Sequence, residues 1–209
     1  MSVPMMSLDA VTAGYGRAAD ALHGVSVEFF QGVTLITGPN GSGKSTLLEV
    51  LASNVLPRAG VAKIGSSSVL TAQTRMLRNY VPHEVGLIPA LTLREHLLLA
   101  APADDADAVA TEVKQWGLDE WVDAPTENLS TGNRRKAWLL VCLLDRTDCI
   151  LLDEPFNGLD ADSVEHLTMC IREWIACGSA VVLASHTMPS LIETLKPRVL
   201  HMREGRVDE

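Results

Sequence analysis

The chain has 209 residues, of which 47% are hydrophobic and 21% are charged, so a disordered or collagen-like chain is excluded and one sizeable domain with a lobe or an insertion is expected. Seventeen basic residues against 26 acidic residues give a net charge of −9, and only 4% of the residues are aromatic. Nucleic-acid binding needs basic patches and stacking rings, so this balance argues against a nucleic-acid partner.

The first half of the chain predicts strands, then a loop, then a helix. From residue 7 to residue 32, short apolar runs alternate with polar residues and glycines, which is the pattern of half-buried strands and turns. Val33–Thr37 is a nearly continuous apolar run that leads into a glycine-rich loop, and a helical pattern follows at Leu47. Val69–Thr71 is a further candidate for a short strand.

The second half predicts a helical lobe and then a parallel sheet. Residues 93–121 place apolar side chains at three- and four-residue steps, which indicates helices. Cys149–Leu152 and Ala180–Ala184 are compact apolar strands, and residues 164–175 between them present one apolar helix face. Strands that alternate with helices in this way predict βαβ units.

The glycine-rich loop matches the phosphate-binding pattern GxxxxGK[ST]. Its glycines let successive backbone N–H groups and the start of the next helix point at phosphate oxygens. Lys44 can reach the β- and γ-phosphates, and the Ser45 hydroxyl can take one place on Mg²⁺. The residues expected to hold the nucleotide, called the phosphate loop below, are Gly38, Pro39, Asn40, Gly41, Ser42, Gly43, Lys44, Ser45 and Thr46.

Polar side chains end two of the later strands. Asp153 and Glu154 follow a buried strand at the edge where open parallel sheets bind ligands, and His186 follows the next strand. With a phosphate loop in the same chain, we expect Asp153 to hold Mg²⁺ and Glu154 to orient and polarise the attacking water. A lone histidine is more often structural, but at this edge His186 is expected to hydrogen-bond the γ-phosphate. The predicted catalytic residues are therefore Glu154, His186 and Lys44.

The order and spacing of these motifs resemble the nucleotide-binding domains of ATP-binding cassette (ABC) transporters, over residues 15–206. Many phosphate-loop ATPases share the phosphate loop and the acidic pair, whereas the LSxG element between them is characteristic of this family. The aromatic loop, the signature sequence, the D-loop and the switch histidine of the family resemble, in chain order, Gly14-Tyr15-Gly16, Leu129-Ser130-Thr131-Gly132-Asn133, Asn157-Gly158-Leu159-Asp160 and His186.

The resemblance implies an α/β fold in which a P-loop NTPase core with a mainly parallel sheet carries an antiparallel β lobe and a small helical lobe. Residues 1–209 would then form a single ABC-type ATPase domain, with the helical lobe at about residues 84–131. The family analogy implies ATP and Mg²⁺ as cofactors and a Tyr15 that stacks on adenine. Ser130 and Gly132 would meet the γ-phosphate bound by the opposite subunit of a head-to-tail homodimer or heterodimer.

The sequence departs from the family pattern at three positions. His83 stands where the family usually has glutamine, and its neutral imidazole offers one acceptor nitrogen that could still meet Mg²⁺ or its water. Thr131 replaces the first signature glycine and Asn133 the signature glutamine, while Ser130 and Gly132 remain. Because a β-branched residue narrows the freedom of the backbone, we expect weaker closure of the dimer.

The resemblance implies an ATP-hydrolysing subunit that powers transport through a separate membrane-spanning permease. The longest apolar stretches are far shorter than the ~20 residues that span a bilayer, and no secretory signal is visible at the start. We therefore expect a peripheral protein on the cytoplasmic face of a membrane, which it reaches only through the permease. Val85–Leu93 is expected either to dock on that permease or to pack under the helical lobe, and Arg134-Arg135-Lys136 to be a solvated helix face.

Two other functions stay open. Soluble ABC-type regulatory or mechanical ATPases, which work on ribosomes or DNA, usually carry paired cassettes, coiled-coil insertions or basic arms, and this acidic sequence shows none of them. A degenerate cassette that binds ATP but barely hydrolyses it is favoured by His83 and Thr131. The phosphate loop, the acidic pair and His186 argue against such a cassette.

Overall fold

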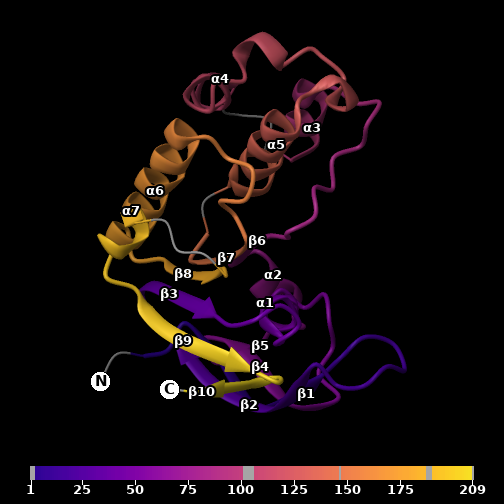
Figure 1. The fold of residues 1–209 in the computed structure, drawn as a ribbon, viewed down its shortest axis with the longest axis vertical. Coiled ribbons are helices and arrows are strands. Elements are labelled where there is room, and N and C mark those ends of the chain that lie inside the picture. Colours follow the sequence, from indigo (N-terminus) through magenta and orange to yellow (C-terminus); the bar gives the residue numbers. More distant parts are fainter. Residues whose placement is uncertain (1–2, 101–105, 146, 187–189, 209) are drawn as a thin grey trace.

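The computed structural model describes residues 3–100, 106–145, 147–186 and 190–208 (Figure 1). The strands are β1 (Met6–Ala13), β2 (Leu22–Phe29), β3 (Gly32–Thr37), β4 (Ala59–Ile64), β5 (Ser67–Ser68), β6 (Arg78–Val81), β7 (Cys149–Asp153), β8 (Ala180–Ala184), β9 (Arg198–Arg203) and β10 (Arg206–Asp208). The helices are α1 (Lys44–Leu51), α2 (Ala72–Arg75), α3 (Leu93–Ala100), α4 (Ala106–Gln115), the 3₁₀ turns η1 (Asp119–Trp121) and η2 (Thr126–Asn128), α5 (Thr131–Leu143), α6 (Ala161–Ala176) and α7 (Ser190–Glu193).

A mainly parallel sheet forms the centre of the molecule, as the apolar runs predict. Within the described residues its strand order is β10-β9-β3-β8-β7-β6, and all neighbours run parallel except β9 and β10. Every residue of β7 and β8 is buried, because both faces of the sheet are covered. Successive side chains point to opposite faces, so Ile150 and Leu151 belong to different hydrophobic clusters.

A second, antiparallel sheet lies below the central sheet in the view of Figure 1. Its strand order in the described chain is β2-β1-β4-β5, and each pair of neighbours is antiparallel. The register of β1 against β2 shifts between Leu8 and Val11, where Ala10 has a φ of 48° and its N–H donates to the Ser26 hydroxyl at 2.9 Å. This sheet confirms the antiparallel β lobe expected from the sequence.

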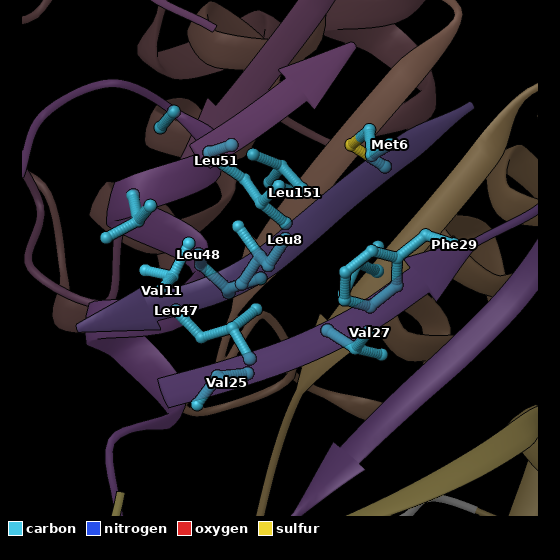
Figure 2. Close-up of a cluster of buried hydrophobic side chains, with 14 of the residues drawn as sticks. Met6, Leu8, Val11, Val25, Val27, Phe29, Leu47, Leu48, Leu51 and Leu151 are labelled. Atoms are coloured by element: carbon cyan, nitrogen blue, oxygen red, sulfur yellow. The ribbon is translucent and has the colours of Figure 1, made fainter. Parts of the chain in front are cut away.

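One hydrophobic cluster fills the space between the two sheets (Figure 2). Val27 and Phe29 reach it from β2, because alternate residues of that strand point inward. Leu48 reaches it from α1 and Leu151 from β7, so the helix that follows the phosphate loop is packed on both sheets. Burial of its apolar side chains therefore holds α1 firmly at the edge of the central sheet.

We expect Phe29→Ala to lower the free energy of unfolding by about 3–5 kcal/mol, because the change removes a fully buried ring and leaves a cavity. Urea unfolding followed by circular dichroism measures this loss. The neighbouring Phe30 is only partly buried, which makes Phe30→Ala a matched control with a smaller expected loss. Equal losses for the two variants would contradict the position of Phe29 in the core.

Helices α3, α4, α5 and α6 lie on the other side of the central sheet, with α3 and α4 farthest from the antiparallel sheet (Figure 1). Leu93, Trp116, Leu139 and Ile171, one from each helix or its end, join the second cluster with side chains of the central strands. Residues 84–131 contain α3, α4, η1 and η2, and α5 begins at the last of them. None of the helices in the described residues combines the length and apolarity needed to cross a membrane.

The short strand predicted at Val69–Thr71 is wrong. The strand β5 occupies Ser67–Ser68 instead, and Thr71 caps the start of α2 by accepting a hydrogen bond from the Thr74 N–H at 3.3 Å. Threonine is favoured in strands but also caps helices well, and the local hydrogen bond decides between the two.

The β9–β10 hairpin supports the phosphate loop from behind. The Gly205 N–H donates to the Ser42 carbonyl at 3.0 Å, and the Gly205 carbonyl accepts from the His23 N–H at 2.9 Å. The Met202 carbonyl lies so close to Gly38, whose φ is 149°, that a Cβ would collide with it. Glycine is therefore required there, and segments from both halves of the sequence hold the loop.

Candidate nucleotide site

The phosphate loop joins the carboxyl end of β3 to the start of α1. Gly43 precedes the first helical residue with a φ of 104°, and a Cβ there would lie 2.7 Å from the Ala21 carbonyl. The first turn of a helix has N–H groups without partners in the helix, and its dipole favours negative charge. The loop therefore presents an anion-binding end of α1 to the cavity described below.

Lys44 is held across the phosphate loop. Its ammonium donates to the carbonyls of Gly38 at 2.9 Å and Pro39 at 3.1 Å, and the residue is 7% exposed. Both acceptors belong to the same phosphate loop as the lysine, so its charge is fixed beside the backbone N–H groups of that loop. A polyphosphate bound there would meet this ammonium without a large rearrangement of the loop.

Asp153 ends β7 and is buried next to the phosphate loop. Burial raises the pKa of Asp153, whereas hydrogen bonding with Ser45 and the charge interaction with His83 lower it. Its Oδ1 is buried and has no hydrogen-bond partner among the described residues. Burying a carboxylate oxygen without a hydrogen-bond partner costs free energy. Asp153 Oδ1 and the Ser45 hydroxyl together form an oxygen donor set of the kind that Mg²⁺ prefers.

Glu154 is tied to the end of the neighbouring strand β8. Its N–H donates to the Ala184 carbonyl at 2.8 Å, and its Oε2 accepts from the Ser185 hydroxyl at 3.0 Å. Its Oε1 accepts from the His186 N–H at 3.0 Å and lies 2.7 Å from His186 Nδ1. With a φ of 47°, Glu154 holds a left-handed conformation that costs a non-glycine residue roughly 1 kcal/mol or more. The carboxylate position is thus specified by several independent contacts.

A cavity of about 510 Å³ brings most of the sequence-predicted residues together. It is lined by Tyr15, Ala21, Asn40, Gly41, Gly43, Lys44, Ser45, Thr46, His83, Glu154, Asn157 and His186. Gly38, Pro39 and Ser42 belong to the loop but not to this lining, and Asp153 is buried behind it. A cavity of this size, lined by a lysine, a glutamate and a histidine, can hold a drug-sized anionic ligand.

Tyr15 lies at the rim of the cavity and is half exposed. Its hydroxyl donates to the Glu49 carboxylate and accepts from the Thr46 hydroxyl at 3.3 Å. Burial and the hydrogen bond to Glu49 raise the pKa of Tyr15, so the phenol stays neutral. Arg58 fixes the loop that carries it, with hydrogen bonds to the Gly16 carbonyl at 2.8 Å and to Asp20 at 2.6 Å.

Ser130 and Gly132 lie at the start of α5 and do not line the cavity. The exposed Ser130 caps α5 by accepting from the Asn133 N–H at 3.1 Å. Gly132 approaches the Gly158 carbonyl, which would lie 3.3 Å from an added Cβ. Within one chain the signature residues are therefore separate from the phosphate loop.

The basic run after the signature is not a uniformly solvated face, which corrects the expectation for Arg134-Arg135-Lys136. Arg134 is exposed, but Arg135 is only 4% exposed and Lys136 forms a salt bridge of 2.8 Å with Asp160. The salt bridge and hydrogen bonding with Ser163 lower the pKa of Asp160 to about 2. Successive helical residues point in different directions, so a basic run does not share one environment.

Sequence reasoning missed several contributors to this region. Ala21 lines the cavity, and Glu49 receives the Tyr15 hydroxyl. Asn157, assigned above only to the D-loop, lines the cavity as well. Glu49 comes four residues after Ser45 and three after Thr46 on α1, so helical periodicity could have placed it on their face. Ala21 has no chemical signal in the sequence, and its place depends on the packing of the loop before β2.

The comparisons with known proteins agree with this geometry. A family model described as ABC transporter matches residues 22–157. The cytochrome c biogenesis ATP-binding export protein CcmA of Cupriavidus necator is 32% identical over 197 residues, which cover 90% of this chain and 87% of CcmA. The manganese transport system ATP-binding protein MntA of Synechocystis is 29% identical over 199 residues, covering 89% of this chain and 76% of MntA.

The fold is also similar to a solved dimer of an ATP-binding cassette in a post-hydrolysis state bound to ADP and Pi. The TM-score is 0.84 at 23% identity, with 98% of this chain and 97% of that chain covered. This likeness confirms the predicted P-loop architecture with its antiparallel and helical parts. Together with the match over residues 22–157, it leads to one conclusion: this chain belongs to the ABC transporter family, among its ATP-binding subunits.

Proposed function

We propose that this chain hydrolyses ATP with Mg²⁺ and thereby powers an ABC transporter whose membrane-spanning permease is a separate protein. The observation that carries the proposal is that Lys44, Glu154 and His186 line one cavity. Phosphoryl transfer to water uses a cation that binds the phosphates, a carboxylate that orients the water and a group that hydrogen-bonds the γ-phosphate. Lys44, Glu154 and His186 would supply these three groups.

The phosphate loop is the proposed binding element for the nucleotide. Its N–H groups and the Lys44 ammonium would bind the β- and γ-phosphates, and Thr46 lies in the same first turn of α1. Tyr15, at the rim, would stack on adenine once its hydroxyl leaves Glu49 and Thr46. These contacts orient the γ-phosphate toward Glu154, which supplies catalysis by positioning.

Ser45, Asp153 and His83 are the residues that would hold Mg²⁺. The partnerless Oδ1 of Asp153 supports this assignment, because a cation would satisfy a buried oxygen that otherwise lacks a partner. His83 lines the same cavity, so its imidazole can contribute directly or through water. When bound, Mg²⁺ would neutralise negative charge on the phosphates.

Glu154 and His186 would carry out the chemical step together. In the present arrangement the Glu154 carboxylate accepts from the His186 backbone and lies against its ring. If the ring of His186 turned to the γ-phosphate, Oε1 of Glu154 would keep its bond from the His186 N–H but lose its contact with the ring, and the lone pair set free would orient and polarise the attacking water. Ser185 would keep the other oxygen in place through its hydroxyl.

A dimer would complete each site. Ser130 is exposed and Gly132 lies beside it, so both are accessible to a second subunit in a head-to-tail homodimer or heterodimer. Their positions at the start of α5 suit contact with the γ-phosphate of a nucleotide bound by the partner. Residues 1–209 would then act as one ABC-type ATPase domain, with residues 84–131 as its helical lobe.

The stretch Val85–Leu93 supports a permease contact at some residues and internal packing at others. Val85 is 39% exposed and Ile88 53% exposed, whereas Leu93 is fully buried in the second cluster. We propose that the exposed residues face the permease, so that the protein lies on the cytoplasmic side of a membrane without contacting lipid itself. A nucleic-acid partner is no part of this proposal, given the net charge of −9.

Phosphate release from Mg·ATP by the purified protein tests the proposed function. We expect turnover with Mg²⁺ and its loss when EDTA removes the metal, because the phosphates and Asp153 would then lack their shared cation. Specific activity should rise with protein concentration if two subunits complete each site. Isothermal calorimetry with ATP serves as the control for binding, and binding without any Mg²⁺-dependent phosphate release would instead indicate a degenerate cassette.

A further inference from the structure

Arg135 is a buried cation in the second turn of α5, the helix that Ser130 caps. It is 4% exposed, while the adjacent Arg134 is exposed. A lone cation is rarely buried to this degree, because its removal from water costs several kcal/mol unless polar groups replace the water. The hydrogen-bond partners of its guanidinium therefore indicate which segments Arg135 holds together.

The guanidinium bridges two segments at the edge of the central sheet. Nη1 donates to the carbonyls of Pro82 at 3.1 Å and His83 at 3.0 Å, and Nη2 donates to those of Asp153 at 3.1 Å and Glu154 at 2.9 Å. Pro82 and His83 follow β6, Asp153 is the last residue of β7 and Glu154 follows it, and β7 is hydrogen-bonded to β6. One planar group thus sets the spacing between the His83 segment and the acidic pair.

The four acceptors are backbone carbonyls, and no carboxylate pairs with this guanidinium among the contacts of the described residues. Burial lowers the pKa of Arg135, while the charges of Asp153 and Glu154 raise it, and an arginine remains charged under all ordinary conditions. Charge-assisted hydrogen bonds are the strong ones, so these carbonyls are held firmly. One of them belongs to Glu154, whose left-handed φ of 47° needs such support.

We propose that Arg135 is a positioning residue. It couples the start of α5, where Ser130 and Gly132 lie, to His83 and Glu154, which line the nucleotide cavity of the same chain. The inference rests on the proposed function, since it assigns a role within that same hydrolytic site. A partner's nucleotide that contacts Ser130 acts on α5, and α5 carries the guanidinium that fixes both carbonyl pairs. Closure of the dimer is thereby transmitted to the groups that orient the water and the metal.

This role affects turnover and leaves nucleotide binding nearly intact. Arg135 does not line the cavity, and the phosphate loop is held by Lys44 and the β9–β10 hairpin instead. A small displacement of a catalytic group lowers the rate by as much as about 100-fold, whereas the binding contacts remain. A residue needed only for general stability would lower the amount of folded protein and would not change the turnover of the folded fraction.

The test compares Arg135→Met with Arg134→Met, a matched change at the exposed neighbour. We expect kcat of Arg135→Met to fall about 10- to 100-fold with KM for Mg·ATP within about twofold of the wild-type value, and Arg134→Met to behave as wild type. Arg135→Lys should lie between them, because a single ammonium cannot serve both carbonyl pairs at once. Circular dichroism and calorimetric ATP titration give the folded, binding-competent fraction to which kcat is referred.

Wild-type kcat in folded Arg135→Met, or a raised KM with unchanged kcat, would overturn the proposal. If Arg135→Met fails to fold, Arg135→Lys decides in its place, and an unaltered kcat in that variant overturns the proposal equally. Failure of the proposed function has a different signature, namely no Mg²⁺-dependent phosphate release by the wild-type protein, and the role of Arg135 falls with it.

Discussion

Glu154→Gln is expected to lose nearly all ATP hydrolysis while it retains Mg·ATP binding. The amide has the shape of the carboxylate, and its one oxygen can still accept from the His186 N–H while its NH₂ group donates to the Ser185 hydroxyl oxygen. It lacks the charge that polarises a water molecule and accepts its proton, and loss of a general base lowers turnover by about 10²- to 10⁴-fold. Single-turnover phosphate release measures the loss, and calorimetry measures the retained affinity.

ATP should also trap this variant as a dimer, because the state before hydrolysis persists. Size-exclusion chromatography with and without Mg·ATP would detect the change. Glu165→Gln, at an exposed carboxylate on α6, is the matched control and should leave turnover unchanged. Undiminished hydrolysis by Glu154→Gln would assign the water to another residue of the cavity.

Lys44→Ala should remove most of the affinity for Mg·ATP and leave the fold intact. The ammonium now donates to the Gly38 and Pro39 carbonyls, and a bound polyphosphate would replace or share these bonds. Two hydrogen bonds to a charged group, at about 1.5–3 kcal/mol each, predict a weakening of at least ~100-fold. Isothermal titration with ATP measures the change, and urea unfolding checks the stability.

Lys63→Ala is the matched control, because Lys63 is an exposed lysine on β4 away from the cavity lining. Its affinity for ATP should equal that of the wild-type protein. Calorimetry that finds wild-type affinity in Lys44→Ala as well would refute the assignment of the loop to phosphate binding.

The parts of the fold that the sequence predicts are those decided by short-range patterns. The runs at Val33–Thr37, Cys149–Leu152 and Ala180–Ala184 are buried strands because a sheet covered on both faces needs apolar residues without interruption. The phosphate loop is equally local, since its glycines and Lys44 act through the backbone around them. The cavity then follows from the fact that parallel strands end at a common edge.

Arg135 could not be predicted, because its surroundings come from segments far away in the sequence. Between Arg134 and Lys136 it has the pattern of a solvated helix, and only the packing of α5 on the ends of β6 and β7 buries it. The left-handed backbone conformation of Glu154 could not be predicted either, because glutamate has no preference for a positive φ. Tertiary contacts decide such positions, and a single sequence does not record them.

The support of the phosphate loop by the β9–β10 hairpin has a consequence for how the protein is made. The loop leaves the ribosome long before Met202 and Gly205. The Met202 carbonyl lies against Gly38, and the Gly205 N–H donates to the Ser42 carbonyl of the loop. A growing chain therefore carries the full phosphate-binding sequence while the loop still lacks its contacts with Met202 and Gly205. We therefore expect ATP binding to arise only after residues 202–205 have been made, when β3, β7 and β8 have already been synthesised.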